Sequence, residues 1–335
     1  MVDSLFTFTV EVRRGGQLLG AAVASLAPCV EDALFRGVLN GGLPNDGTVP
    51  AFTVAPVWAA PGPPAVAGVT LAHAGEPAGE YGLGPFAAKA RAIIQDLLRR
   101  KVLKVGAHVE WSVIAAEQPP APPPRFRARA SRAPYPFEMG HLPKVTPGSF
   151  AVSVEPCVLR AIRKAVVTCF TAERAGLLVG SLVYDRDRAA AALAVTGQIP
   201  LAPAAGGASN IHFSLGPDSF RAAKKTLAEV ANGASAVGWW HSHPPCAQCP
   251  MNPDCAADTV FFSPDDVQVH ASAFSAAYMV ALVAGKVRDR PAFDPGLRLY
   301  SWKDGAIIKR RLRVLEGSER CRAHAAPSTQ LEAPG

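Results

Sequence analysis

Residues 236–244 read AVGWWHSHP, an apolar run that ends in two histidines separated by one residue. The run from Ala236 to His241 predicts a buried strand, and Pro244 ends it. Side chains two positions apart on an extended backbone share a face, so His241 and His243 can meet one ion. Imidazole nitrogen is a preferred ligand of zinc. An HxH pair alone more often represents two packed or exposed histidines, so a metal site requires a third ligand.

Asp266 is the candidate for that third ligand. It ends the sequence SPDD at residues 263–266. Ser as N-cap, Pro at the first helical position and acids in the first turn together predict the start of a helix. This capping interpretation explains the tetrapeptide without a metal. The two interpretations are compatible, because a carboxylate in the first turn of a helix is also held in a fixed direction.

Two further side chains are candidates for chemistry. Glu173 lies in TAERAGLLVG, residues 171–180, between an expected helix over 158–169 and an expected strand over 177–184. A single glutamate in such a connection is by default a surface residue. His270 falls within the helix that follows Ser263. Either it supports the metal ligands from behind or it is a packed core histidine, and the sequence leaves both open.

Taken together and in order, Glu173 before GLLVG, then WWHSHP, then Ser263-x-x-Asp266 resemble the JAMM (MPN-plus, JAB-domain) zinc metalloprotease family. That family includes deubiquitinating isopeptidases and bacterial relatives. The resemblance covers roughly residues 149–315, and the order of expected elements agrees with the family's fold. It implies an α-β-α arrangement, the cytidine-deaminase-like MPN fold, with a mixed sheet flanked by helices. The chain is similar to a bacterial member with an added N-terminal domain.

The resemblance also implies roles for individual residues. His241, His243 and Asp266 would hold one catalytic Zn²⁺. Glu173 matches the family's general base, which accepts a proton from water and later delivers it to the leaving amine. Ser263 matches the serine that helps to stabilise the oxyanion. The implied activity is a zinc metallopeptidase that cleaves an amide or isopeptide bond at the C-terminus of a ubiquitin-like or sulfur-carrier-like protein.

Two alternatives to that activity stay open. One is a non-catalytic MPN scaffold, as metal-free members of the fold are. The complete set of Glu173, His241, His243, Ser263 and Asp266 argues against it, because a scaffold has no reason to keep these residues. The other is a zinc hydrolase of small peptides or amides, in which a long loop narrows the cleft.

The sequence departs from the family between His243 and Ser263. The family places seven residues there, whereas residues 244–262 number 19. The additional residues include Cys246, Cys249 and Cys255. A C-x2-C pair with a third cysteine suits a second, structural zinc that needs one more ligand. A redox or disulfide role and three unpaired thiols are the alternatives. Either this insertion bulges out and returns Ser263 to its place, or the site is rebuilt.

The pattern of apolar residues predicts four segments. Residues 1–117 form a small α+β domain of unknown role, with a strand from Phe6 to Arg13 and a helix from Phe86 to Arg100, and Gly- and Pro-rich loops between them. Residues 118–148 are a linker rich in Pro and Arg, or a structured arm in which 137–142 pack against the second domain. The metalloprotease domain spans 149–315, and 316–335 are a disordered tail.

Composition limits the partners. The net charge is +7, with a basic stretch between Arg91 and Arg132, but no aromatic-basic pattern accompanies it, so nucleic-acid binding is not expected. No run of 18 apolar residues exists, so no membrane span is expected. The chain has an odd number of cysteines, seven, of which Cys29, Cys157, Cys169 and Cys321 are scattered, and this fits a reducing cytoplasm better than a disulfide framework. The expected partner is a protein substrate, and the oligomeric state is left undetermined.

Overall fold

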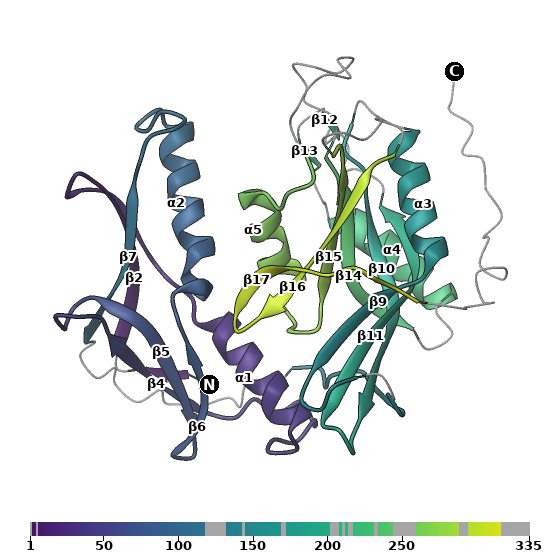
Figure 1. Cartoon of the computed structure of the whole chain (residues 1–335), viewed down its shortest axis with the longest axis horizontal. Helices are drawn as coiled ribbons and strands as arrows, with labels where there is room; N and C mark the ends of the chain where they lie inside the picture. Colours follow the sequence, from purple (N-terminus) through teal and green to yellow (C-terminus); the bar gives the residue numbers. More distant parts are fainter. Residues whose placement is uncertain are drawn as a thin grey trace. The chain divides into compact units, whose positions relative to one another are not determined.

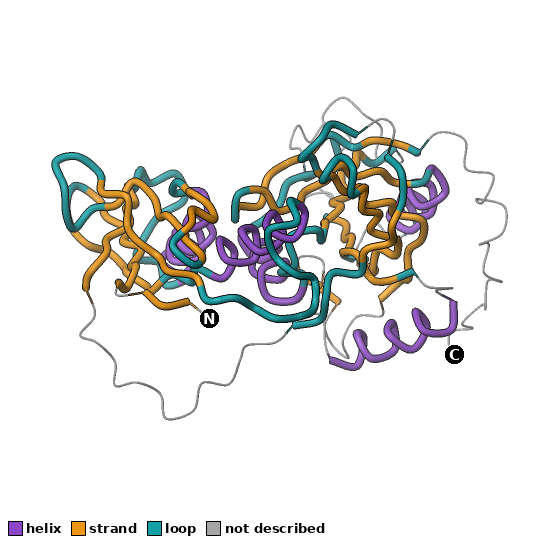
Figure 2. Tube along the Cα trace, turned by 90° about the horizontal axis from the view of Figure 1, so that it is seen from below, coloured by secondary structure: helices purple, strands orange, loops and turns teal. Residues whose placement is uncertain are grey.

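The computed structural model describes residues 2–4, 6–117, 132–142, 145–168, 172–201, 208–209, 212–213, 217–230, 234–243, 259–287 and 294–315. These residues fall into two compact units. The first comprises Met1–Tyr135, Phe262–Val280 and Tyr300–Lys309, and the second comprises Pro136–Phe261, Ala281–Leu299 and Arg310–Gly335. Each unit contains more strands than helices, and Figure 2 draws the strands in orange and the helices in purple. The units differ from the expected domains 1–117 and 149–315, because two later segments belong to the first unit.

A three-stranded antiparallel sheet begins the first unit, in the order β3-β2-β7. Its strands are β2 (Phe6–Arg14), β3 (Gln17–Val23) and β7 (Glu110–Glu117). Phe8, Val10 and Val12 are buried, and the residues between them are partly exposed. This alternation places one face of β2 on the core and confirms the strand predicted for Phe6 to Arg13.

The segment expected to be Gly- and Pro-rich loops contains regular structure, so that expectation is wrong. It holds helix α1 (Ala27–Leu39) and the four-stranded sheet β1-β4-β5-β6. The strands of that sheet are β1 (Val2–Ser4), β4 (Phe52–Trp58), β5 (Val66–His73) and β6 (Glu76–Tyr81). Their Ala, Gly and Pro residues have low strand propensity, and pairing within the sheet overrides it.

Two longer helices complete the described core of the first unit. Helix α2 (Ala87–Arg99) follows the short 3-10 turn η1 (Gly84–Phe86) and confirms the predicted amphipathic helix. Its Leu97 packs with Val12 and Leu103 in one buried cluster. Helix α5 (Pro264–Ala273) packs beside α2, and the Gln95 Nε2 atom donates a hydrogen bond to the Asp265 carboxylate at 3.1 Å.

Parts of the expected linker 118–148 are packed. Residues 118–131 lie outside the described part of the chain. Tyr135 is buried against α1, where its hydroxyl donates to the Glu31 carboxylate at 2.9 Å and Arg132 forms an ion pair with the same carboxylate at 2.7 Å. Strand β8 (Phe137–Met139) pairs in parallel with β10, and the Leu142 amide donates to Asp185 at 2.8 Å. Residues 137–142 therefore belong with the second unit, as the structured-arm alternative expects.

A nine-stranded mixed sheet runs in the order β17-β16-β15-β14-β10-β11-β9-β18, with β8 paired to β10. Figure 1 labels its strands β9 to β11 and β14 to β17. Its longest strands are antiparallel neighbours, β10 (Ala175–Asp185) and β11 (Ala190–Leu201). The other strands are β9 (Phe150–Val154), β14 (Ser235–Ser242), β15 (Val280–Gly285), β16 (Gly296–Lys303), β17 (Ala306–Arg310) and β18 (Arg313–Val314). β12 (Ala208–Ser209) and β13 (His212–Phe213) form a separate hairpin.

Two helices of the second unit, α3 (Pro156–Val167) and α4 (Pro217–Val230), pack against β11. Val158, Leu159, Ile162 and Val166 form the buried stripe of α3, the spacing expected of an amphipathic helix. The strands predicted at residues 177–184 and 236–241 and the helix predicted over 158–169 are all present to within a few residues. In the described part of the chain, each helix falls short of the length and apolar character that crossing a bilayer requires.

Candidate metal centre

Strand β14 carries the two histidines at its end. Trp239, Trp240, His241 and Ser242 are all buried, because β14 lies inside the sheet beside β10. Gly176 on β10 pairs with Trp240, and a Cβ atom at this position would lie 2.2 Å from the indole Nε1 atom. Only glycine leaves room for this indole, whose N–H donates to Gln198 at 3.0 Å. The apolar run therefore fixes the backbone of His241 firmly.

The hydrogen bond of His243 determines which ring nitrogen can bind a metal. Its Nδ1 atom lies 2.8 Å from the carbonyl oxygen of Thr259. A carbonyl oxygen only accepts, so Nδ1 carries the proton and the lone pair of the neutral ring is on Nε2. That Nε2 atom lies 3.1 Å from the Nε2 atom of His241. Two nitrogen ligands of a tetrahedral zinc are about 3.3 Å apart for Zn–N distances of roughly 2.0–2.1 Å.

Aromatic rings enclose the two imidazoles. The indole of Trp239 is stacked on His241, with ring centroids 4.4 Å apart and an interplanar angle of 15°. The ring of Phe261 lies 4.9 Å from that of His243 and is 49% exposed. His241 is buried behind these rings, whereas Phe261 presents an apolar edge to solvent. One side of the histidine pair is therefore covered by the buried indole of Trp239, and the other borders an exposed aromatic side chain.

The helix start predicted at Ser263 is confirmed, including its cap. Ser263 has an extended backbone, and its hydroxyl oxygen accepts the Asp266 amide at 3.1 Å. In return the Asp266 carboxylate accepts the Ser263 amide at 2.7 Å, which completes a capping box. One carboxylate oxygen of buried Asp266 is thus engaged, and a carboxylate has further lone pairs for a cation. The capping role and a ligand role are compatible.

His241, His243 and Asp266 form one group. A ligand atom from each residue lies within 4.8 Å of the others, and all three residues are buried. Chain connectivity favours this arrangement, because only four residues separate Asp266 from Phe261, whose ring contacts His243. Two imidazoles and one carboxylate are the donor set that suits Zn²⁺ with an open fourth position. The donor set, its spacing and the tautomer of His243 therefore fit a zinc ion.

Glu173 is positioned by its neighbour. The Arg174 amide donates to the Ser242 hydroxyl at 2.9 Å, and the Ser242 amide donates to the Arg174 carbonyl at 2.8 Å. Ala175 pairs with His241, the last pair between β10 and β14, and Glu173 lies two residues before Ala175. Glu173 is half-buried there.

His270 is a packed core histidine. It is fully buried, and its ring is stacked on Trp302 at 5.3 Å and on Phe274 at 6.1 Å. Phe262 contacts it edge-on at 5.9 Å. His270 is not a member of the His241–His243–Asp266 group. Of the two readings that the sequence left open, the structure supports core packing.

The three cysteines Cys246, Cys249 and Cys255 lie outside the described residues, so the second zinc site and its alternatives stay predictions. Sequence reasoning missed Thr259 and Phe261, which contact His243 from the residues before Ser263. The only signal for them was their place just before the helix start, which carries no ligand chemistry of its own.

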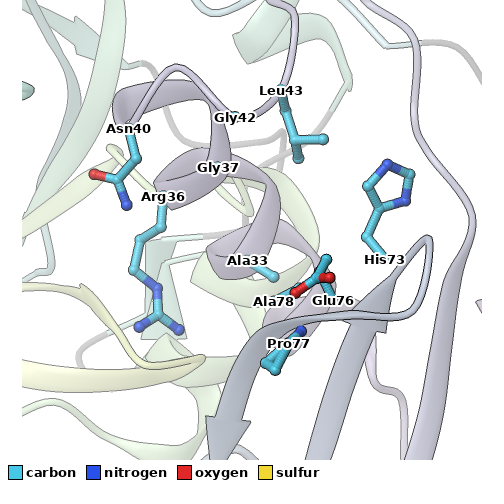
Figure 3. A pocket seen from close by; sticks show the side chains of 10 residues that line it. All are labelled: Ala33, Arg36, Gly37, Asn40, Gly42, Leu43, His73, Glu76, Pro77 and Ala78. Atoms are coloured by element: carbon cyan, nitrogen blue, oxygen red, sulfur yellow. The ribbon is translucent and has the colours of Figure 1, made fainter.

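A pocket in the first unit is a second candidate site that the sequence did not indicate (Figure 3). It has a volume of about 300 Å³, between the end of α1 and the β5–β6 hairpin. Arg36 and Asn40 line it from the helix, and His73 and Glu76 from the hairpin. Arg36 already forms an ion pair with Asp32 at 2.6 Å. Mixed charges and mainly small apolar side chains give this pocket no defined ligand chemistry.

Comparison with known proteins adds little. No family model matches the chain, and no curated protein matches it. Among solved structures, the solution structure of a protein from Desulfitobacterium hafniense is similar at 20% sequence identity, over 52% of this chain and 99% of that one, with a TM-score of 0.34. A likeness at this identity and TM-score carries no argument about fold or activity.

Proposed function

We propose that this chain is a zinc-dependent metallopeptidase of the JAMM type, which hydrolyses an amide or isopeptide bond. The observation that carries the proposal is the buried group of His241, His243 and Asp266, with one ligand atom from each within 4.8 Å of the others. Two imidazoles and one carboxylate that converge in this way match the protein ligands of catalytic zinc sites, which keep a fourth position for water.

The local hydrogen bonds support the same proposal. The carbonyl of Thr259 holds the His243 proton on Nδ1, and the 3.1 Å between the two Nε2 atoms is close to the spacing of two ligands on one zinc ion. The capping box fixes the Asp266 carboxylate in the first turn of α5. All three ligands are therefore held by other contacts.

A bound zinc ion would supply Lewis acidity, which lowers the pKa of a coordinated water from about 15.7 to about 7. Glu173 accepts the proton of the attacking water and delivers it to the leaving amine. The bonds between Arg174 and Ser242, which hold the residue after Glu173 beside the residue between the two histidines, support this assignment. Half-burial of Glu173 keeps its carboxylate accessible to substrate.

Ser263 contributes a hydrogen bond to the developing oxyanion. Its hydroxyl oxygen accepts the Asp266 amide, so its own proton is available for donation outward from the helix start. A donor that is already held in place needs little rearrangement when negative charge develops on the substrate oxygen. Ser263 thus has two roles, capping α5 and stabilising charge.

The substrate proposed is the C-terminus of a ubiquitin-like or sulfur-carrier-like protein, and this rests on the resemblance to the JAMM family alone. A cytoplasmic location is part of the same proposal. Within the described residues, buried Cys29 is a thiol, as it would be in a reducing compartment.

Metal content and hydrolysis test the proposal on the full chain. We expect close to one catalytic zinc per chain in wild type, its loss in the double variant His241→Ala/His243→Ala, and no loss in the control His141→Ala, whose side chain is 66% exposed. The same proteins are assayed on linear ubiquitin-like fusions and on short peptides. Activity on peptides alone would favour the small-amide hydrolase. A metal-free, inert wild type would mean that the chain is a scaffold.

A further inference from the structure

Thr259 forms hydrogen bonds both to His243 of the candidate metal centre and to Lys286, the residue that follows β15. Its carbonyl oxygen accepts from His243 Nδ1 at 2.8 Å and from the Phe261 amide at 3.1 Å. Its own amide donates to the Lys286 carbonyl at 2.9 Å, and its hydroxyl oxygen accepts the Lys286 amide at 2.8 Å. The residue is buried, and all these partners belong to the second unit.

The hydrogen bonds of the Thr259 hydroxyl help to hold the backbone carbonyl of the same residue in place. Two bonds to one residue, Lys286, hold the amide and the side chain of Thr259 on the backbone that follows β15. The hydroxyl also lies 3.4 Å from the His243 carbonyl, to which it donates. With both ends of the residue anchored, its carbonyl has little freedom to turn away from the imidazole.

Gly285 leaves the space that this arrangement needs. A Cβ atom at residue 285 would lie 2.6 Å from the Thr259 hydroxyl oxygen and 3.1 Å from the Thr259 carbonyl carbon. Only glycine tolerates that approach. His243 is held against the same strand, because its amide donates to the Ala284 carbonyl at 2.8 Å. Residues 284–286 therefore serve as a common support for His243 and Thr259.

We infer that Thr259 is a positioning residue for the metal centre. Its anchored carbonyl keeps the His243 proton on Nδ1 and the ring oriented, so that the Nε2 lone pair faces His241. The inference rests on the proposed zinc site and adds a residue to it. The bond between His243 and Thr259 joins the two described residues that flank 244–258.

Two variants of the full chain separate this role from plain stability. Thr259→Val keeps the shape and removes the hydroxyl, and Thr259→Ser keeps the hydroxyl and removes the methyl group. Thr168→Val is the control, because its hydroxyl bonds only to carbonyls at the end of α3. The readouts are the Kd for Zn²⁺ by chelator competition, the visible spectrum of the Co²⁺-loaded protein, and the Tm with and without Zn²⁺.

Loss of a partner that orients a metal ligand costs about 10- to 100-fold in metal affinity. We expect Thr259→Val to raise the Kd for Zn²⁺ by at least about tenfold, to alter the Co²⁺ spectrum, and to reduce the Zn²⁺-induced rise in Tm. Thr259→Ser and Thr168→Val should bind as wild type does. If Thr259→Val is too unstable to purify, Gly285→Ala, which pushes on the same hydroxyl, should raise the Kd in its place.

The outcomes distinguish the two proposals. A Thr259→Val protein that loses Tm equally with and without Zn²⁺, and keeps the wild-type Kd and Co²⁺ spectrum, would overturn the positioning role and leave the zinc site intact. A wild-type chain whose affinity for Zn²⁺ matches that of His241→Ala/His243→Ala would overturn the zinc site itself, and the positioning role with it.

Discussion

Ser263 and Asp266 hold each other through two reciprocal hydrogen bonds, with the Ser263 amide 2.7 Å from the Asp266 carboxylate and the Asp266 amide 3.1 Å from the Ser263 hydroxyl. The pair begins helix α5 and aims a buried carboxylate that belongs to the same group as His241 and His243. The same contact caps the helix and holds the carboxylate of the proposed ligand. Substitutions at Ser263 and Asp266 can therefore separate the capping role from the chemical role.

Replacing Asp266 with Asn tests the ligand role. The Asn side-chain carbonyl can still accept the Ser263 amide, so the Tm of the metal-free protein should change little. Loss of the negative charge should weaken Zn²⁺ binding by more than about tenfold. Chelator competition measures the affinity, and Asp265→Asn, which removes an exposed neighbouring charge, is the matched control. Equal Zn²⁺ affinity in the two variants would exclude Asp266 as a ligand.

Replacing Ser263 with Ala should affect both stability and rate. Loss of an N-cap side chain costs about 1 kcal/mol of stability, and loss of one oxyanion donor lowers kcat about 100- to 1000-fold. Ser263→Thr keeps the hydroxyl and should retain most of both. Urea unfolding and steady-state hydrolysis measure the two effects. A Ser263→Ala enzyme with reduced stability and wild-type kcat would restrict Ser263 to capping.

Glu173→Gln should separate metal binding from catalysis. Glutamine cannot accept a proton from water, so kcat should fall about 100- to 10,000-fold, the usual contribution of a general base. Zinc content should stay as in wild type, because Glu173 is not among the three proposed ligands. Glu138→Gln, on an exposed part of β8, is the control. Wild-type turnover by the Glu173→Gln enzyme would assign the base to another residue.

Phe261→Ala should change substrate preference without changing metal content. The ring is 49% exposed and lies 4.9 Å from His243, so it can pack against an apolar side chain next to the scissile bond. We expect KM to rise severalfold for peptides with a large apolar residue there and to stay constant for those with alanine, while kcat changes little. A uniform loss of kcat on both peptides would instead indicate damage to His243.

Cys29 should resist alkylation in the folded protein. Burial raises the pKa of its thiol to about 12, and the nearby Asp32 carboxylate adds to the effect. The thiolate is the reactive form, so at pH 8 iodoacetamide should modify half-exposed Cys157 long before Cys29. Peptide mass spectrometry after timed quenching distinguishes the two sites. In urea the difference should vanish. Rapid labelling of Cys29 in the native state would mean that α1 opens readily.

The raised pKa of Cys29 also sets the sign of a pH effect. Because the folded state holds the thiol proton more tightly than the unfolded state does, the free energy of unfolding should fall as pH rises from the ordinary thiol pKa, 9.0, toward about 12. Below the ordinary value Cys29 contributes no pH dependence. Urea unfolding of wild type and Cys29→Ala across this interval should show a steeper fall for wild type, and parallel curves would contradict the assignment.

Local patterns in the sequence were sufficient for much of the secondary structure. The alternation around Val10, the amphipathic spacing of α2 and α3, and the apolar runs of β14 and β15 each follow from a period or a run within one segment. The Ser263 cap was also predictable, because capping depends on residues three positions apart. Helix α1 and strands β3 to β6 were missed, since their Gly, Pro and Ala residues have weak local propensity, and strand pairing and packing in the folded unit override it.

The sequence by itself determined which side chains can bind zinc and which end of each element they occupy: His241 and His243 two positions apart at the end of a strand, and Asp266 in the first turn of a helix. Only the tertiary structure decided the distance between them, the tautomer of His243 and the contacts of Thr259 and Phe261. The type of ligand atom is a property of each single residue. The direction of the His243 lone pair, in contrast, depends on the carbonyl of Thr259, which lies 16 residues away in the sequence.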